Sequence, residues 1–216
     1  MRRAAALVAI LALAGCGGGK RGTTEQASQG TTTAAGCTPA QTHVHPNGGY
    51  RNKHLKLNPA KTYKLVFETN CGSFTITLNQ KLAPNATGSL VSLVQRGFFN
   101  DTFFHRIVPG FVIQGGDPTG QGTGGPGYET HDRVPASAAY VHGVVAMAKT
   151  GAEPAGTAGS QFFVVTGQNA SLQPDYAIVG KVTQGLDVVD RIGVLGDANE
   201  RPTQNVVISK VRTETS

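Results

Sequence analysis

An arginine, an aromatic ring and a carboxamide come close together in the middle of the chain, in the segment FHRIVPGFVIQGGD (104–117). Arg106 closes one predicted strand, a Pro-Gly turn follows, and Phe111 and Gln114 belong to the next strand. Adjacent antiparallel strands joined by a short turn bring their side chains into one neighbourhood. A second block, GSQFF (159–163), again places polar residues before aromatic ones. One permanent cation among aromatic walls suits binding, or a reaction that needs no proton transfer, because a guanidinium stays protonated.

Other chemical signatures in the sequence are weak. A GxGxxG pattern at 120–125 matches the dinucleotide fingerprint, but that motif needs a helix starting within it, and here a Pro-Gly pair follows. Ser160 does not lie in a GxSxG nucleophile elbow. His43, His45 and His54 share a segment but lack a fourth ligand for a metal ion. The sequence therefore predicts no metal site and no cofactor.

Hydrophobic periodicity supplies the elements that must position these residues. Phe74, Ile76 and Leu78 alternate with polar residues, which is typical of a half-buried strand. Pro84 suits the first turn of a helix and Gly97 its end. Eight short strands with one early and one late helix predict a mainly β fold, a closed eight-stranded antiparallel β-barrel capped by two α-helices. The expected strands are 63–69, 73–78, 102–107, 111–114, 144–148, 162–166, 177–182 and 205–212, and the expected helices start near Pro84 and span about 186–192.

Three blocks of the sequence, FHRIVPGFVIQGGD, GTGGPGYE and GSQFFVVT, resemble the signature blocks of cyclophilins, the cyclosporin-binding family of peptidyl-prolyl cis–trans isomerases. The resemblance runs from about Tyr63 to Arg212, and the blocks occur in the order found in the family. It implies an eight-stranded barrel with two helices, the fold that periodicity indicates independently. We therefore expect a cyclophilin-like domain at 62–214.

The resemblance implies a catalyst of X-Pro isomerisation whose catalytic residues are Arg106, Phe111 and Gln114. The barrier to this rotation is amide resonance, about 18–20 kcal/mol. It falls when a donor stabilises the lone pair of the twisted proline nitrogen, and by the resemblance Arg106 is that donor. Residues at the remaining substrate-binding positions are His105, Val112, Gly122, Ala148, Lys149, Gln161, Phe163, Leu172 and Tyr176.

The sequence departs from the family pattern at several of these positions. Val112 replaces a common methionine, and Lys149 stands where many members have asparagine. Ser171 and Tyr176 stand where well-known eukaryotic members have tryptophan and histidine. The resemblance with these departures implies activity on proline-containing polypeptides but weak or no cyclosporin binding. A non-catalytic module that binds proline peptides on the same fold is the alternative interpretation.

The first residues resemble a bacterial lipoprotein signal peptide (1–15). Two arginines precede an apolar run of 11 residues, too short for a spanning helix of about 20. The run ends in LAGC, which places the lipidated cysteine at Cys16. An ordinary secretory signal with a chance cysteine is the alternative. A flexible tether (16–36), rich in glycine, threonine and glutamine, follows, and 37–61 forms an extension before the domain.

Charge is divided unevenly between these parts. Residues 62–216 carry 11 Lys/Arg against 12 Asp/Glu, whereas residues 17–61 carry six against one. The folded domain is thus nearly neutral, which argues against nucleic acid as a partner. Basic residues beside a lipid anchor attract an anionic bilayer, although they could equally serve only to solvate the tether. We expect an exported, membrane-anchored monomer on the extracytoplasmic face, where it assists the folding of client proteins.

Cysteine usage agrees with export. With Cys16 acylated, Cys37 and Cys71 remain, and an oxidising compartment favours a disulfide between them. The bridge would tie the extension to the first hairpin and contribute roughly 3–4 kcal/mol in the chain-entropy model. Two free buried thiols are the alternative.

Overall fold

The computed structural model describes residues 36–53 and 55–216. The predicted signal peptide, Cys16 and almost all of the predicted tether lie outside the described residues, as does His54. Among the residues described, no helix is long and apolar enough to cross a membrane. The predictions about export and lipidation therefore stay predictions.

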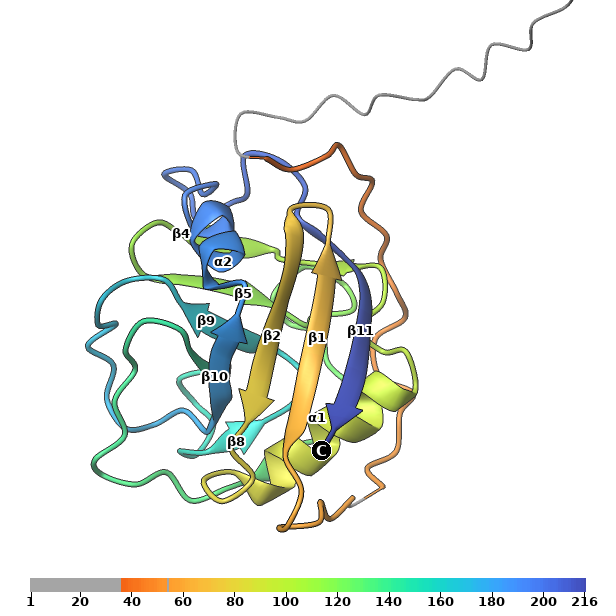
Figure 1. Cartoon of the computed structure of the whole chain (residues 1–216), viewed down its shortest axis with the longest axis vertical. Coiled ribbons are helices and arrows are strands. Elements are labelled where there is room, and N and C mark those ends of the chain that lie inside the picture. The colour runs from red at the N-terminus through yellow and green to blue at the C-terminus, as the bar shows by residue number, and fades with distance from the viewer. Residues whose placement is uncertain (1–35, 54) are drawn as a thin grey trace, which may run out of the picture.

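Nine strands form one antiparallel sheet, in the order β3-β11-β1-β2-β10-β7-β9-β5-β4, and two short strands, β6 and β8, pair separately. The sheet curls around a core, with helices α1 and α2 at opposite ends of the domain (Figure 1). The strands are β1 Tyr63–Thr69, β2 Gly72–Leu78, β3 Thr102–Phe103, β4 Arg106–Val108, β5 Val112–Gly115, β6 Thr130–His131, β7 Val144–Met147, β8 Thr157–Ala158, β9 Phe162–Val165, β10 Ile178–Gln184 and β11 Val207–Thr215, and the helices are α1 Pro84–Gln95 and α2 Leu186–Gly193.

The sheet is an open half-barrel, so the prediction of a closed eight-stranded barrel is wrong. The strand expected over 102–107 is divided at Phe104 and His105. Its first part pairs with β11 and its second part with β5, and these two parts are the edges of the sheet. Closure would require β3 and β4 to pair with each other, but they follow one another along the chain with only residues 104–105 between them, so the sheet stays open there. The expectation of a mainly β fold with two helices is confirmed.

Two apolar clusters lie on opposite faces of the central strands. The larger fills the half-barrel and contains Phe67, Phe74 and Phe162, with the first two rings stacked at 4.9 Å between centroids. The smaller contains Val112 and Phe163. Because side chains alternate along a strand, each of β5 and β9 contributes to both clusters. The second cluster is the floor on which the candidate site is built.

The two helices are positioned by contacts from distant segments. Helix α1 starts with a proline, and the Asp132 carboxylate accepts hydrogen bonds from the backbone N–H of Asn85 and Ala86 at 3.0 and 2.8 Å. These are among the N–H groups that a helix leaves without internal partners, so Asp132 caps α1 from outside. The amphipathic helix α2 buries Val189 and Ile192.

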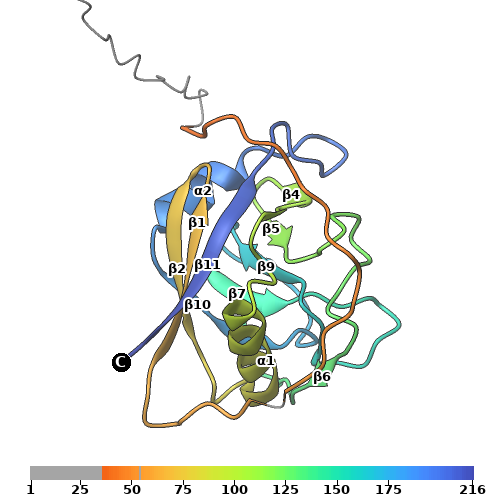
Figure 2. The same ribbon diagram turned by 90° about the vertical axis from the view of Figure 1, so that its right-hand side faces the viewer.

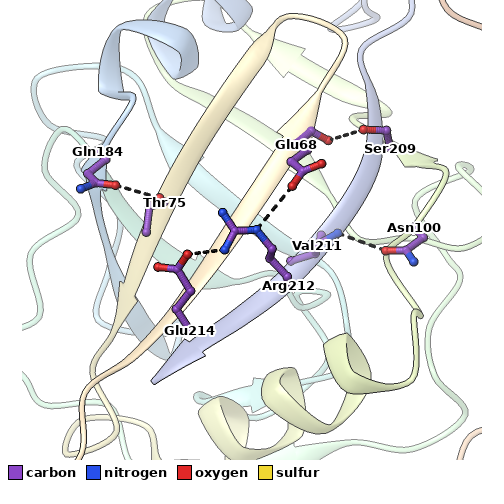
Figure 3. A network of polar contacts seen from close by, with 8 residues as sticks. All are labelled: Glu68, Thr75, Asn100, Gln184, Ser209, Val211, Arg212 and Glu214. Atoms are coloured by element: carbon purple, nitrogen blue, oxygen red, sulfur yellow. Dashed lines mark hydrogen bonds and ion pairs between the residues drawn. The ribbon is translucent and has the colours of Figure 1, made fainter. Parts of the chain in front are cut away.

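A polar network covers the outer face of β1 and β11 (Figure 3). Arg212 lies between Glu68, 3.4 Å away, and Glu214. Ser209 Oγ donates to the Glu68 carbonyl at 3.0 Å, and the side chain of Asn100 accepts from the backbone of β11. The pairs are half exposed, so each contributes about 0–1 kcal/mol. Their main effect is to keep this face of the sheet solvated.

The described parts of the extension, 37–53 and 55–61, follow the outside of the domain (Figure 2). It begins beside the β1–β2 hairpin and descends along the domain to the start of β1 (Figure 2). A disulfide joins Cys37 to Cys71 in the hairpin turn, as predicted, and Asn70 Nδ2 donates to the Thr38 carbonyl at 2.6 Å. The sequence does not predict how closely this segment follows the domain surface, because the segment has no periodic pattern.

Candidate functional site

Nine of the twelve predicted site residues line one pocket of about 220 Å³. The pocket lies against β4, β5 and β9, on the face of the sheet that carries the smaller apolar cluster. Its lining residues are Arg106, Phe111, Val112, Gln114, Ala148, Lys149, Phe163, Leu172 and Tyr176. The structure thus brings the cation, the carboxamide and the aromatic walls together, as the sequence predicts.

Strand register explains this convergence. Arg106 is directly opposite Gln114 in the β4–β5 ladder, and Gln114 is directly opposite Phe163 in the β5–β9 ladder. Directly opposed residues point to the same face of a sheet. Three adjacent strands therefore present a guanidinium, a carboxamide and a phenyl ring side by side.

Arg106 is held by two partners. Its Nε donates to Glu200 Oε2 at 2.6 Å, and its Nη1 donates to Gln114 Oε1 at 3.3 Å. The arginine side chain is 33% exposed and that of Glu200 49%, so the ion pair adds only about 0–1 kcal/mol to stability. The ion pair instead orients Arg106: it occupies one edge of the guanidinium while the side chain lines the pocket. Glu200 is 94 residues away in sequence, and no local pattern indicates it.

A chain of amide hydrogen bonds leads from Arg106 out of this pocket. Gln114 Nε2 donates to Gln161 Oε1 at 3.0 Å, and Gln161 Nε2 donates to the Gly124 carbonyl at 3.0 Å. Each amide both accepts and donates, which fixes its orientation. The chain therefore links the position of Arg106 to a glycine-rich loop.

That loop forms one wall of a second, larger groove of about 600 Å³. Gly122 and Gln161 line it, and Gln114, Ala148 and Lys149 line both cavities. Two more of the predicted substrate-binding residues are thus placed beside the pocket. We call residues 117–127 the glycine loop and this second cavity the groove.

Buried Asp117 organises the glycine loop from inside. Its carboxylate accepts hydrogen bonds from the backbone N–H of Thr119, Gly122 and Gly124 at 2.7, 2.5 and 3.1 Å. Burial alone would raise the pKa of Asp117, but the hydrogen bonds from Gly124, Thr119 and Gly122 hold it below its ordinary value. A Cβ on Gly124 would lie 2.1 Å from Asp117 Oδ1, so only glycine fits there.

His105 lines neither cavity. It lies under the glycine loop, where a Cβ on Gly122 would be 3.9 Å from its Nε2, and neither ring nitrogen has a protein partner among the described residues. Burial lowers the pKa of His105; the Asp117 carboxylate opposes this and the Arg106 cation adds to it. The structure therefore places His105 beneath the loop, where burial favours its neutral form, and its predicted place at the substrate-binding rim stays a prediction.

The Lys149 ammonium is buried and paired beside the pocket. Its side chain is 2% exposed, with Nζ 2.6 Å from Asp175 Oδ2 and 5.4 Å from the centroid of the Tyr176 ring. The neighbouring Ala148 N–H donates to the Gln161 carbonyl at 2.9 Å. With its charge paired and buried, Lys149 adds no free cation to the site.

The aromatic wall has a support that the sequence does not predict. Tyr176 packs edge-on against Phe163 at 5.5 Å and against buried Tyr140 at 6.0 Å. The Tyr140 hydroxyl donates to the Tyr176 carbonyl at 2.8 Å and accepts from the Tyr176 N–H at 2.9 Å. Tyr140 thus fixes the segment that carries Tyr176.

This architecture, with an arginine beside an aromatic pocket on a curved antiparallel sheet, matches a known class of protein. The model of the family "Cyclophilin type peptidyl-prolyl cis-trans isomerase/CLD" matches residues 64–213. Similar curated proteins include "Peptidyl-prolyl cis-trans isomerase-like 1" of Aspergillus oryzae, 37% identical over 68% of this chain and 93% of its own length. The protein of the same name from Bos taurus is 38% identical over 68% of this chain and 89% of its own length.

Solved structures of a cyclophilin-type isomerase also match the fold of this chain. A cyclophilin-type isomerase of Cryptosporidium parvum superposes with a TM-score of 0.66 at 30% identity, covering 71% of this chain and 98% of its own. A structure of that protein in the presence of the dipeptide Ala-Pro gives a TM-score of 0.65. The chain belongs to the cyclophilin-type peptidyl-prolyl cis–trans isomerase family.

Proposed function

We propose that this chain accelerates cis–trans isomerisation of X-Pro bonds in polypeptides outside the cytoplasm and thereby assists their folding. The observation that carries the proposal is Arg106, held by Glu200 and Gln114 beside a pocket walled by Phe111 and Phe163. A proline ring is apolar and compact, and a pocket of about 220 Å³ with such walls suits it.

The chemistry follows from the groups in the pocket. Walls that grip the proline ring hold one side of the bond while the other side rotates. In the twisted state the proline nitrogen has a lone pair that amide resonance no longer uses, and a guanidinium N–H of Arg106 can donate to it. A donor that acts mainly in the twisted state lowers the barrier, and each reduction of about 1.4 kcal/mol is tenfold in rate. Gln114 would orient Arg106 and bond the client backbone.

The decisive experiment compares the wild-type chain with Arg106→Ala, using exchange of an Ala-Pro peptide followed by NMR. We expect a loss of about 10²–10³ in kcat/KM, as when one transition-state donor is removed elsewhere. Arg133→Ala is the matched control, because this exposed arginine lines neither cavity. If wild type and Arg106→Ala both bind the peptide without accelerating exchange, the chain is instead a proline-peptide-binding module.

Export and anchoring belong to the same proposal. Acylation of Cys16 would place the domain on the extracytoplasmic face, and the disulfide between Cys37 and Cys71 suits an oxidising compartment. One lipid chain anchors weakly, and basic residues before the domain strengthen attraction to an anionic bilayer. Labelled fatty acid should enter the wild-type chain but not Cys16→Ala, and only the wild type should sediment with membranes. Equal labelling of both would contradict the anchor.

Weak cyclosporin binding is a further part of the proposal. Ser171 is exposed and stands where better-known members have tryptophan, so a large apolar contact is missing. We expect inhibition only at micromolar cyclosporin or above, measured by the same exchange assay, and nanomolar inhibition would contradict this.

A further inference from the structure

The extension contacts the glycine loop through a ladder of hydrogen bonds. The His45 N–H donates to the Pro118 carbonyl at 2.7 Å, the Gly48 N–H to the Gly125 carbonyl at 2.9 Å, and the Tyr50 N–H to the Pro126 carbonyl at 3.0 Å. A Cβ on Gly127 would lie 3.1 Å from Gly48 Cα, so the two backbones are in close contact. Residues 45–50 therefore lie against the outer side of the loop.

Asn47 is the residue of this segment that lines the groove. Its Oδ1 accepts a hydrogen bond from the Gly125 N–H at 2.9 Å. Together with the bond from Gly48, this pairs both backbone groups of Gly125 with the extension. The loop is thus held by Asp117 from inside and by Asn47 from outside.

The contact continues to the catalytic arginine. The carbonyl of Gly124, next to Gly125, accepts from Gln161, whose amide accepts from Gln114, which in turn accepts from Arg106. Arg106 is also held by Glu200 and by the β4–β5 ladder, so a shift of the loop at Gly125 would displace the groove wall at Gly124 and Gln161 and leave Arg106 in place. The family match begins at residue 64, so Asn47 lies outside it.

We propose that Asn47 is a positioning and specificity residue supplied by the extension: it fixes the glycine loop and completes the wall that a client polypeptide contacts beyond its X-Pro residues. This inference rests on the proposed function, because it assigns a role in client recognition at the same site. A short substrate would fill only the pocket, whereas a longer polypeptide would also occupy the groove. Asn47 therefore acts on long substrates and hardly at all on short ones.

The experiment compares two substrates on the full-length chain: an end-blocked Ala-Pro dipeptide, and a peptide with three further residues on each side of the same bond. For Asn47→Ala we expect kcat/KM on the long peptide to fall about fivefold, mainly through KM, and the dipeptide to be unchanged within about twofold. Asn47→Asp keeps an acceptor oxygen and should restore most of the long-peptide activity. His43→Ala, an exposed change in the same extension, is the matched control.

Calorimetric affinity for the long peptide separates this inference from the proposed function. If the wild type binds without accelerating exchange, the proposed function fails, and Asn47→Ala should still weaken binding about fivefold. Three results would overturn the inference: equal affinity of Asn47→Ala and wild type for the long peptide, an equal loss on both substrates, or an Asn47→Asp variant no better than Asn47→Ala. Thermal unfolding of each variant verifies that the fold is intact, as expected for an exposed side chain.

Discussion

The pocket and the groove lie side by side but are built in different ways. Three strands present the pocket's side chains, and their ladders fix Arg106, Gln114 and Phe163 relative to one another. The groove is walled by a loop whose backbone N–H groups donate hydrogen bonds to two side chains, Asp117 and Asn47, in addition to the backbone bonds from the extension. A strand ladder consists of backbone bonds that a substitution leaves in place, whereas a substitution at Asp117 or Asn47 removes part of the support of the loop. Substitutions at the groove should therefore change the local structure, and those at the pocket only the chemistry.

The largest effect on stability is expected from Asp117→Asn. An amide NH₂ in place of Oδ2 would face the N–H groups of Gly122 and Gly124, which would leave buried donors without acceptors. We expect a loss of about 2–4 kcal/mol in unfolding free energy, measured by urea denaturation. Of the activity that the folded protein retains, turnover of long peptides should fall more than turnover of the dipeptide. Equal losses on both substrates would contradict a separate role for the groove.

The unfolding free energy lost in Asp117→Asn should depend on pH in one direction. The pKa of Asp117 is lower in the folded chain than its ordinary value, so its charge contributes stability above that value, about pH 4. The contribution disappears as pH falls through the folded pKa. The difference in unfolding free energy between wild type and Asp117→Asn should therefore be largest near neutral pH and shrink in acid. A difference that grows in acid would show that the carboxylate is not the stabilising form.

A smaller effect is expected at the pocket from Glu200→Gln. The glutamine keeps an acceptor for Arg106 Nε but replaces a charge-assisted hydrogen bond with a neutral one. Because both partners are partly exposed, we expect about a threefold fall in kcat with stability unchanged within about 0.5 kcal/mol. Both the dipeptide and the long peptide should be affected equally, since both need Arg106. Asp187→Asn serves as the control, because it neutralises the acidic partner of another exposed ion pair, the one with Arg191 within α2.

The pocket, which neighbouring strands build, is easier to predict from the sequence than the supports that distant segments provide. Period-2 alternation and local turns predict β1, β2 and β5 closely, and with them Arg106, Gln114 and Phe163 in one pocket. The supports that come from distant segments have no local signal. Glu200 approaches Arg106 from 94 residues away, and Asn47 approaches Gly125 from 78.

Very short strands also escape sequence patterns. Two-residue strands such as β6 and β8 contain too few residues to show any periodicity, and β3 and β4 read as one strand because the hydrophobic pattern continues through their division. The change of pairing partner at that division depends on β11, which lies about a hundred positions further along the chain. Sequence reasoning therefore predicts the class of fold and the pocket better than it predicts how the sheet closes.

The smallest expected effect is that of pH on catalysis, and it tests the pocket directly. A guanidinium carries its charge without exchanging a proton at ordinary pH. Burial lowers the pKa of His105, with Asp117 opposing and Arg106 reinforcing that shift, which favours the neutral imidazole. No group in the proposed mechanism gains or loses a proton, so kcat/KM for the dipeptide should be constant within about twofold between about pH 6 and pH 9. His105→Asn should leave this profile flat. A step near neutral pH in the wild type that disappears in His105→Asn would show that the histidine beneath the glycine loop takes part in the reaction.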